Sequence, residues 1–296
     1  MPGRAPRMAR DHWQRRIEAL DPETDYAEIY RIMAGHEFPW DMTQALGLAL
    51  YRTYAVPSIG ALLASTGEFT ERVHKRYADT GLILDAVLAH GFAHPTGRSA
   101  VRRMNQMHGA YAISNDDMRY VLSTFVVIPM RWLDRFGWRP MSEAERVASA
   151  NYYRELGRHM NIKDSPVTYQ GFAALLDAYE REHFAYSPGG RAVSDATLAL
   201  LAGFYPSPLR PLLRHVTLAL LDPPLRRAFA YPEPDRATRR LTVAGLRARA
   251  AVERRLPPRR RPRYVHELRQ FAIYPEGYIV DELGTFPVSS RSASAG

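Results

Sequence analysis

Helix-start signals recur along this chain, whereas the turn signals of β-hairpins do not. Asp21-Pro22-Glu23 predicts an N-cap followed by proline at the first helical position. Ser114-Asn-Asp-Asp117 places a cap and two carboxylates at the positive end of another helix. Ser142-Glu-Ala-Glu145 is a capping box, and its helix is predicted to run to about Met160. Since no alternating run is joined by Asn-Gly or Asp-Gly, the sequence predicts an all-α fold with a single helical domain.

Changes in composition along the chain predict its domain boundaries. Residues 1–11 are expected to be a flexible N-terminus, residues 12–250 the helical domain, and residues 251–296 a basic extension rich in proline and arginine. Two local questions stay open. Pro129 interrupts or kinks its helix, and a short strand around Tyr278-Ile-Val280 is an alternative to irregular structure.

The absence of cysteine restricts the kinds of site that the chain can build. Disulfides, zinc–thiolate sites, iron–sulfur clusters and thiolate-ligated haem are excluded, which leaves histidine and carboxylates as protein ligands. The 296 residues are 46% hydrophobic and 24% charged, so a sizeable core is expected. The sequence has no uninterrupted apolar run of about 18 residues, so no transmembrane helix is expected, and the N-terminus lacks an apolar secretory signal. A cytoplasmic location is therefore expected.

The net charge of +9 comes from arginine, because only Lys75 and Lys163 among the 40 basic residues are lysines. No recognition motif accompanies the charge, so nucleic acid is not expected as a partner. In the basic C-terminal region, an arginine-rich helix from about Arg236 to Arg255 follows an apolar segment broken by prolines. This combination is typical of peripheral contact with a membrane surface. A packed helix with a solvated arginine face is the simpler interpretation, and both stay open.

Three side chains suggest a cofactor site. His108 recurs with apolar residues such as Met104 and Tyr111 at spacings of three and four, which places it in the apolar stripe of a helix. Arg76 and Thr80 are one turn apart on the preceding helix. A neutral imidazole that points into a core is a common ligand of metals and haem iron. A buried arginine needs an anionic partner, which a haem propionate could supply.

Structural interpretations of the same residues also stay open. A lone histidine in an apolar stripe is more often a hydrogen-bonded core residue than a ligand. Arg76 could instead form a structural ion pair with a nearby carboxylate such as Glu71 or Asp79. From the residues alone, the sequence predicts an all-α protein in which His108 ligates a cofactor or fills the core.

At these residues the chain resembles the MpaB/rubber-oxygenase family, which includes the latex clearing proteins. The resemblance covers roughly residues 13–287, and several blocks together make it specific. These blocks are Glu37-Phe-Pro-Trp-Asp41, Tyr51-Arg-Thr-Tyr-Ala-Val-Pro-Ser58, Lys75-Arg-Tyr-Ala-Asp-Thr80, Ser114-Asn-Asp-Asp117, Tyr120-Val-Leu-Ser-Thr-Phe-Val126, Arg131-Trp132, Asp134-Arg-Phe-Gly-Trp-Arg-Pro140, Tyr274-Pro-Glu-Gly-Tyr278 and Glu282-Leu-Gly-Thr-Phe-Pro287.

The resemblance implies a haem b protein with a globin-like core, acting as an oxygenase or oxidase on a lipophilic organic substrate and O₂. In latex clearing proteins a histidine on an Arg-x-x-His-x-x-x-Arg helix is the proximal iron ligand, and His108 matches it. An upstream Arg-x-x-x-Thr pair belongs to the haem pocket and matches Arg76 and Thr80, which the resemblance makes cofactor-binding and catalytic residues. Arg103, or its neighbour Arg102, is expected to pair with a haem propionate.

Differences from the latex clearing proteins argue against cleavage of polyisoprene. Asn105 and Ala112 stand where arginines flank the histidine, and Asp79 stands where some rubber oxygenases carry a lysine. No acidic residue matches their distal glutamate. A smaller substrate such as a terpenoid or another natural-product intermediate is therefore expected. Two other functions stay open: a haem-dependent dehydrogenase or peroxide-driven oxidase, and a non-enzymatic, membrane-docked protein that binds haem or lipid.

Overall fold

Helices form the regular structure of this protein, as predicted. The computed structural model describes residues 8–285, and no strand occurs in that range. The α-helices are α1 (His12–Glu18), α2 (Tyr26–Ile32), α3 (Pro39–Thr53), α4 (Pro57–Ser65), α5 (Glu68–Glu71), α6 (Val73–His90), α7 (Pro95–Gly109), α8 (Asn115–Phe136), α9 (Glu143–His159), α10 (Tyr169–His183), α11 (Pro188–Gly203), α12 (Arg210–Leu220), α13 (Pro223–Ala228) and α14 (Arg236–Glu253). A π-helical turn, η1 (Met33–Glu37), joins α2 to α3, and short 3₁₀ turns are η2 (Ser207–Leu209), η3 (Val265–Glu267), η4 (Arg269–Phe271) and η5 (Val280–Glu282).

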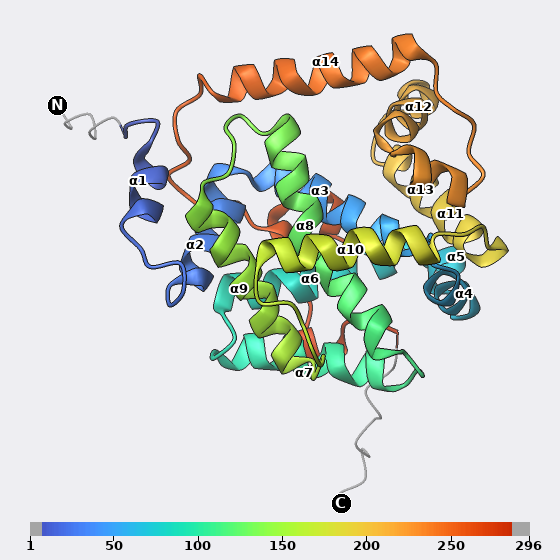
Figure 1. Cartoon of the computed structure of the whole chain (residues 1–296), viewed down its shortest axis with the longest axis horizontal. Coiled ribbons are helices and arrows are strands. Elements are labelled where there is room, and N and C mark those ends of the chain that lie inside the picture. The colour runs from blue at the N-terminus through green and yellow to red at the C-terminus, as the bar shows by residue number, and fades with distance from the viewer. Residues whose placement is uncertain (1–7, 286–296) are drawn as a thin grey trace, which may run out of the picture.

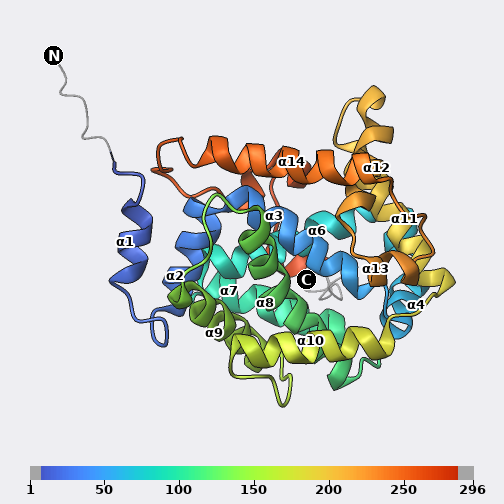
Figure 2. The ribbon, with the colours of Figure 1, turned by 45° about the horizontal axis from the view of Figure 1, so that its top comes forward.

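Helix α8 runs through the middle of the molecule and organises the helices around it (Figure 1). It packs against α3, α9 and α10, while α6 packs against α7 and α11 packs against α4. In Figure 1, α14 extends along the top of the molecule and α7 lies at the bottom. Figure 2 shows α4, α11, α12 and α13 gathered at one end and α1 at the other. This arrangement places α3, α6, α7 and α8 around a common interior.

One extensive hydrophobic core confirms the prediction of a single helical domain. Side chains from α2, α3 and α6 to α10 join in it, with fully buried Phe38, Tyr120 and Phe172 among them. A second cluster, which includes Tyr54 and Phe229, lies beneath α11 to α13. Burial of so much apolar surface is the main favourable contribution to folding. The globin-like core and the boundaries at residues 11 and 250 stay predictions.

Two predicted helix starts are confirmed. The Ser114 hydroxyl accepts a hydrogen bond from the Asp117 amide at 3.0 Å at the start of α8. At the start of α9, Ser142 and Glu145 form the predicted capping box, and the helix ends with Met160 as its C-cap. Pro129 does not interrupt its helix, because α8 continues through it to Phe136.

The predicted helix start at Asp21 is wrong. Its carboxylate accepts a hydrogen bond from the Glu23 amide at 2.9 Å and so forms a turn, and α2 begins only at Tyr26. An Asp side chain that bonds to its own backbone two residues later is a turn signal as well as a cap signal. The strand considered around Tyr278 is absent as well, since Val280–Glu282 forms a 3₁₀ turn.

After α14 the chain returns across α6 and α7. The turns η3 and η4 contact α6, and η5 contacts α7 and α6. Asp85 in α6 accepts hydrogen bonds from the backbone amides of Val265 at 2.8 Å and His266 at 3.3 Å. Residues 264–285, called the C-terminal segment below, therefore form part of the wall around the interior.

Within residues 8–285 no single helix is long and apolar enough to cross a membrane, although α3 and α4, bent by 96° at their junction, meet that test as a pair.

Candidate functional site

A cavity of about 260 Å³ lies among α3, α4, α6, α7 and α8. Leucine, isoleucine, valine, methionine and phenylalanine side chains form most of its wall. Its polar lining includes Arg76, Thr80, His108 and Asp117. Packing of α6 against α7 therefore brings the three residues predicted from the sequence to one cavity. An apolar cavity with a few polar groups is the usual form of a small-molecule site.

His108 lies in the last turn of α7 and lines the cavity. Its Nδ1 atom is buried without a hydrogen-bond partner in the described part of the chain. Burial, together with the positive charge of Arg76, lowers the pKa of His108 to about 4, although the Met104 backbone carbonyl opposes part of this shift. The imidazole is therefore neutral at physiological pH and available as a ligand.

Arg76 and Thr80 bond to each other across one turn of α6. The Arg76 guanidinium donates to the Thr80 hydroxyl, which donates in turn to the Arg76 carbonyl at 2.8 Å. The guanidinium also lies 5.3 Å from the centre of the Phe69 ring. In residues 8–285 Arg76 forms no ion pair, and burial lowers its pKa. A buried cation without a carboxylate partner can bind an anionic group of a ligand.

Asp79, one of the two carboxylates considered as structural partners of Arg76, has other partners. Its carboxylate is 1% exposed and accepts hydrogen bonds from the Lys75 ammonium, the Tyr274 hydroxyl and, at 2.9 Å, the Gly284 amide. Asp79 therefore fastens the C-terminal segment to α6. An ion pair between Arg76 and Asp79, which was the alternative interpretation, is not formed.

The structure does not bring Arg103 to the cavity. Arg103 is 2% exposed, and its Nε donates to the Leu283 carbonyl at 2.6 Å. Its neighbour Arg102 lies at the surface beside Ser99 and Asp281. Neither side chain is among the cavity residues in the described part of the chain, so the role predicted for Arg103 stays a prediction.

Asp117 has a place in the cavity wall that the sequence did not reveal. The sequence predicted a cap here, which the Asp117 amide confirms, and Asp116 also forms an ion pair with Arg119 at 3.1 Å. The Asp117 carboxylate also accepts hydrogen bonds from the Ser58 hydroxyl at 3.0 Å and the Tyr179 hydroxyl at 2.9 Å. These partners are about 60 residues away in the sequence, so no local pattern could have identified them.

Residues 34–252 match the sequence profile of the family described as "ER-bound oxygenase mpaB/B'/Rubber oxygenase, catalytic domain". The chain is 29% identical over 251 residues to "ER-bound oxygenase mpaB'" of Penicillium brevicompactum, which covers 78% of this chain and 59% of that protein. It is 28% identical over 225 residues to "ER-bound oxygenase mpaB" of Penicillium roqueforti (strain FM164), which covers 70% of this chain and 75% of that protein. The chain thus spans less than two thirds of the length of the first relative.

Proposed function

Because the chain belongs to the ER-bound oxygenase mpaB/B'/rubber oxygenase family, we propose that it is a haem b-dependent oxygenase of a lipophilic organic substrate. The observation that carries this proposal is the state of His108. Its imidazole is neutral and lines a largely apolar cavity, and its Nδ1 atom is buried without a hydrogen-bond partner in the described part of the chain. Burying a polar nitrogen in such a place is unfavourable unless a ligand satisfies it. We expect the His108 imidazole to coordinate the iron of the haem.

The protein donors around the cavity fit haem better than a bare metal ion. Within residues 8–285 no three His, Cys, Asp or Glu side chains converge on a metal position. A metal ion without a macrocycle needs about four to six ligands from protein and water. A porphyrin supplies four nitrogen ligands itself, so one imidazole is enough.

The side chains of the cavity have separate roles in this proposal. His108 holds the cofactor, and the low pKa of its imidazole keeps it neutral. Arg76 offers a positive charge to a propionate, and Thr80 fixes the direction of the guanidinium through their hydrogen bond. The apolar wall holds the lipophilic substrate and keeps water out. When bound, haem b supplies the activation of O₂, which no protein side chain here can perform.

The names of the relatives support oxygenase activity, and the substrate is proposed from the cavity. Its apolar wall suits a small lipophilic molecule such as a terpenoid or another natural-product intermediate. The cytoplasmic location stays a prediction. Peripheral membrane contact through the basic C-terminal region also stays a prediction. Three leucines in or beside α14 offer apolar surface for such contact, since Leu209, Leu212 and Leu241 are 46%, 59% and 72% exposed.

Replacement of His108 tests the proposal. The purified protein is expected to contain a stoichiometric b-type haem that binds CO after reduction, measured by absorption spectra and a pyridine haemochrome assay. His108→Ala should lose most of this haem while the far-UV circular dichroism of the helices is kept. His90→Ala is the matched control, because His90 is an exposed histidine at the end of α6.

Two results would contradict the assignment. One is full haem content with an unchanged Soret band in His108→Ala. The other is a wild-type protein without haem after expression with ample iron and haem precursor. Consumption of O₂ with lipophilic substrates separates an oxygenase from a peroxide-driven oxidase, which would turn over with H₂O₂ when O₂ is excluded.

A further inference from the structure

A second, smaller cavity lies directly beside the first. Its volume is about 90 Å³, and α3, α6, α9 and the C-terminal segment contribute most of its wall. Leu50, Thr80, Leu84 and Phe125 line both cavities. These four side chains therefore form the partition between the two spaces. Thr80, which belongs to the proposed cofactor site, therefore borders both cavities.

Tyrosine is the distinctive residue of this second cavity, called the tyrosine chamber below. Tyr30, Tyr77, Tyr152 and Tyr153 line it, and most of the remaining wall is aliphatic or phenylalanine. The carboxylate of Asp85, also in the wall, is already bonded to the C-terminal segment at the Val265 and His266 amides. The hydroxyls of the tyrosines are therefore the polar groups with bonding capacity to spare.

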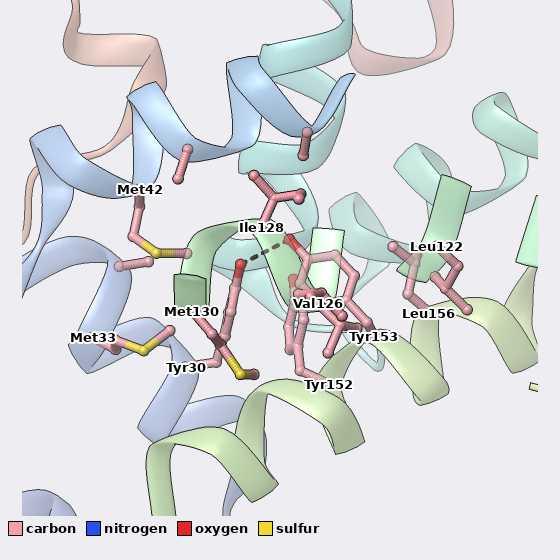
Figure 3. Close-up of a cluster of buried hydrophobic side chains, with 14 of the residues drawn as sticks. Tyr30, Met33, Met42, Leu122, Val126, Ile128, Met130, Tyr152, Tyr153 and Leu156 are labelled. Atoms are coloured by element: carbon pink, nitrogen blue, oxygen red, sulfur yellow. Dashed lines mark hydrogen bonds between the residues drawn. The ribbon is translucent and has the colours of Figure 1, made fainter. Parts of the chain in front are cut away.

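The tyrosine hydroxyls retain hydrogen-bond donors. Figure 3 shows Tyr30 and Tyr153 joined through their hydroxyls, at 2.7 Å, with Tyr152 beside them. Two hydroxyls carry two protons and this bond uses one, so one donor remains. Tyr152 is 4% exposed, and its hydroxyl has no hydrogen-bond partner in the described part of the chain. Burial raises the pKa of both Tyr30 and Tyr152, so each stays a neutral donor.

We propose that the tyrosine chamber binds one end of the substrate, an apolar end that carries a single hydrogen-bond-accepting oxygen such as a carbonyl, an ether or a hydroxyl. The rest of the molecule occupies the main cavity, and in that respect this inference rests on the proposed function. The chamber is smaller than an apolar cavity of about 150 Å³ that holds benzene, so only a short end of a molecule enters it. The accepting oxygen takes up hydroxyl donors that have no acceptor among the described residues.

Substitution of Gly47 should change the volume of the tyrosine chamber. It lies within α3 and lines the chamber, and a Cβ added there meets no atom within 4 Å. Gly47→Leu should therefore fill the chamber and also favour the helix. Gly245→Leu is the matched control, because Gly245 lies within α14, is exposed, and has no atom within 4 Å of an added Cβ.

The test measures binding of 2-alkanones and of n-alkanes of matching length to the full chain by calorimetry. Wild-type protein is expected to bind each ketone roughly tenfold more tightly than the matching alkane, which is the effect of about one net hydrogen bond. Tyr152→Phe should reduce this preference and leave alkane binding unchanged, since the Tyr30–Tyr153 pair keeps one donor. Gly47→Leu should weaken the longer members of both series about tenfold or more, Gly47→Ala should do so less, and Gly245→Leu should match wild type.

Haem content, read from the Soret band of the same samples, separates this inference from the proposed function. Equal binding of ketones and alkanes by wild type, or an unchanged chain-length profile in Gly47→Leu, would overturn the chamber as a substrate site whatever the haem content. A ketone preference that Tyr152→Phe reduces, in protein that never acquires haem, would support the chamber and contradict the haem proposal. Gly47→Leu and Tyr152→Phe are both expected to keep wild-type haem content.

Discussion

At the residue scale, His108 shows how burial sets the chemistry of one side chain. Its spacing in the sequence predicted the helix face on which it lies, and the structure places it on a cavity with Arg76 and Thr80. Sequence could not predict that its Nδ1 would be left without a hydrogen bond, because this depends on atoms of other helices. It also could not predict that Asp79, next to Thr80, would bond to Tyr274, 195 residues later in the chain.

The pH dependence of stability should report the burial of His108. Its pKa falls from 6.5 to about 4 on folding, so the unfolded chain binds more protons between these values. The stabilising effect of the neutral imidazole is complete above pH 6.5 and is lost as the pH falls toward 4. For haem-free protein, urea unfolding at pH 7 and at pH 4.5 should show that wild type loses roughly 2 kcal/mol more than His108→Gln. Equal losses in both proteins would show that His108 is not shielded from solvent.

At the element scale, local signals predicted helices well where their partners are adjacent in the chain. The Ser142–Glu145 capping box is such a case, and α9 begins where it was predicted. Asp21 carries the same type of signal, but its carboxylate bonds within a turn, so the helix starts later. The interiors of the two cavities were not predictable, since they depend on how α3, α6, α8 and α9 pack.

Removal of the α9 cap should have a measurable cost. The Ser142 hydroxyl accepts from the Glu145 amide at 3.2 Å, and α9 carries Tyr152 and Tyr153 into the tyrosine chamber. Ser142→Ala should lower the free energy of unfolding by about 1 kcal/mol, measured by urea denaturation. Ser207→Ala is the control, because Ser207 is exposed and its hydroxyl does not cap a helix, and it should change stability by less than about 0.5 kcal/mol. An equal effect of both substitutions would contradict a capping role.

At the scale of the whole molecule, the C-terminal segment is held by a buried carboxylate. Asp79→Ala would leave the Lys75 ammonium, the Tyr274 hydroxyl and the Gly284 amide without their acceptor. The expected loss is about 3 kcal/mol of unfolding free energy, with faster tryptic cleavage after Arg269. Asp281→Ala removes a half-exposed ion pair and should cost less than about 1 kcal/mol. Cleavage after Arg269 at the same rate in both variants would show that Asp79 does not hold the segment.

The position of the C-terminal segment has a consequence for how this chain can diversify. The family profile ends at residue 252, yet Val265 and Phe271 line the tyrosine chamber and Thr285 lines the main cavity. Part of the space available to a ligand is thus shaped by residues outside the matched catalytic domain. Insertions, deletions or exchanges in this short stretch can reshape the ligand space while every helix that carries His108, Arg76 and Thr80 keeps its sequence. Sequence changes in the C-terminal segment can therefore alter the shape of the ligand space without altering the helices that carry the proposed cofactor site.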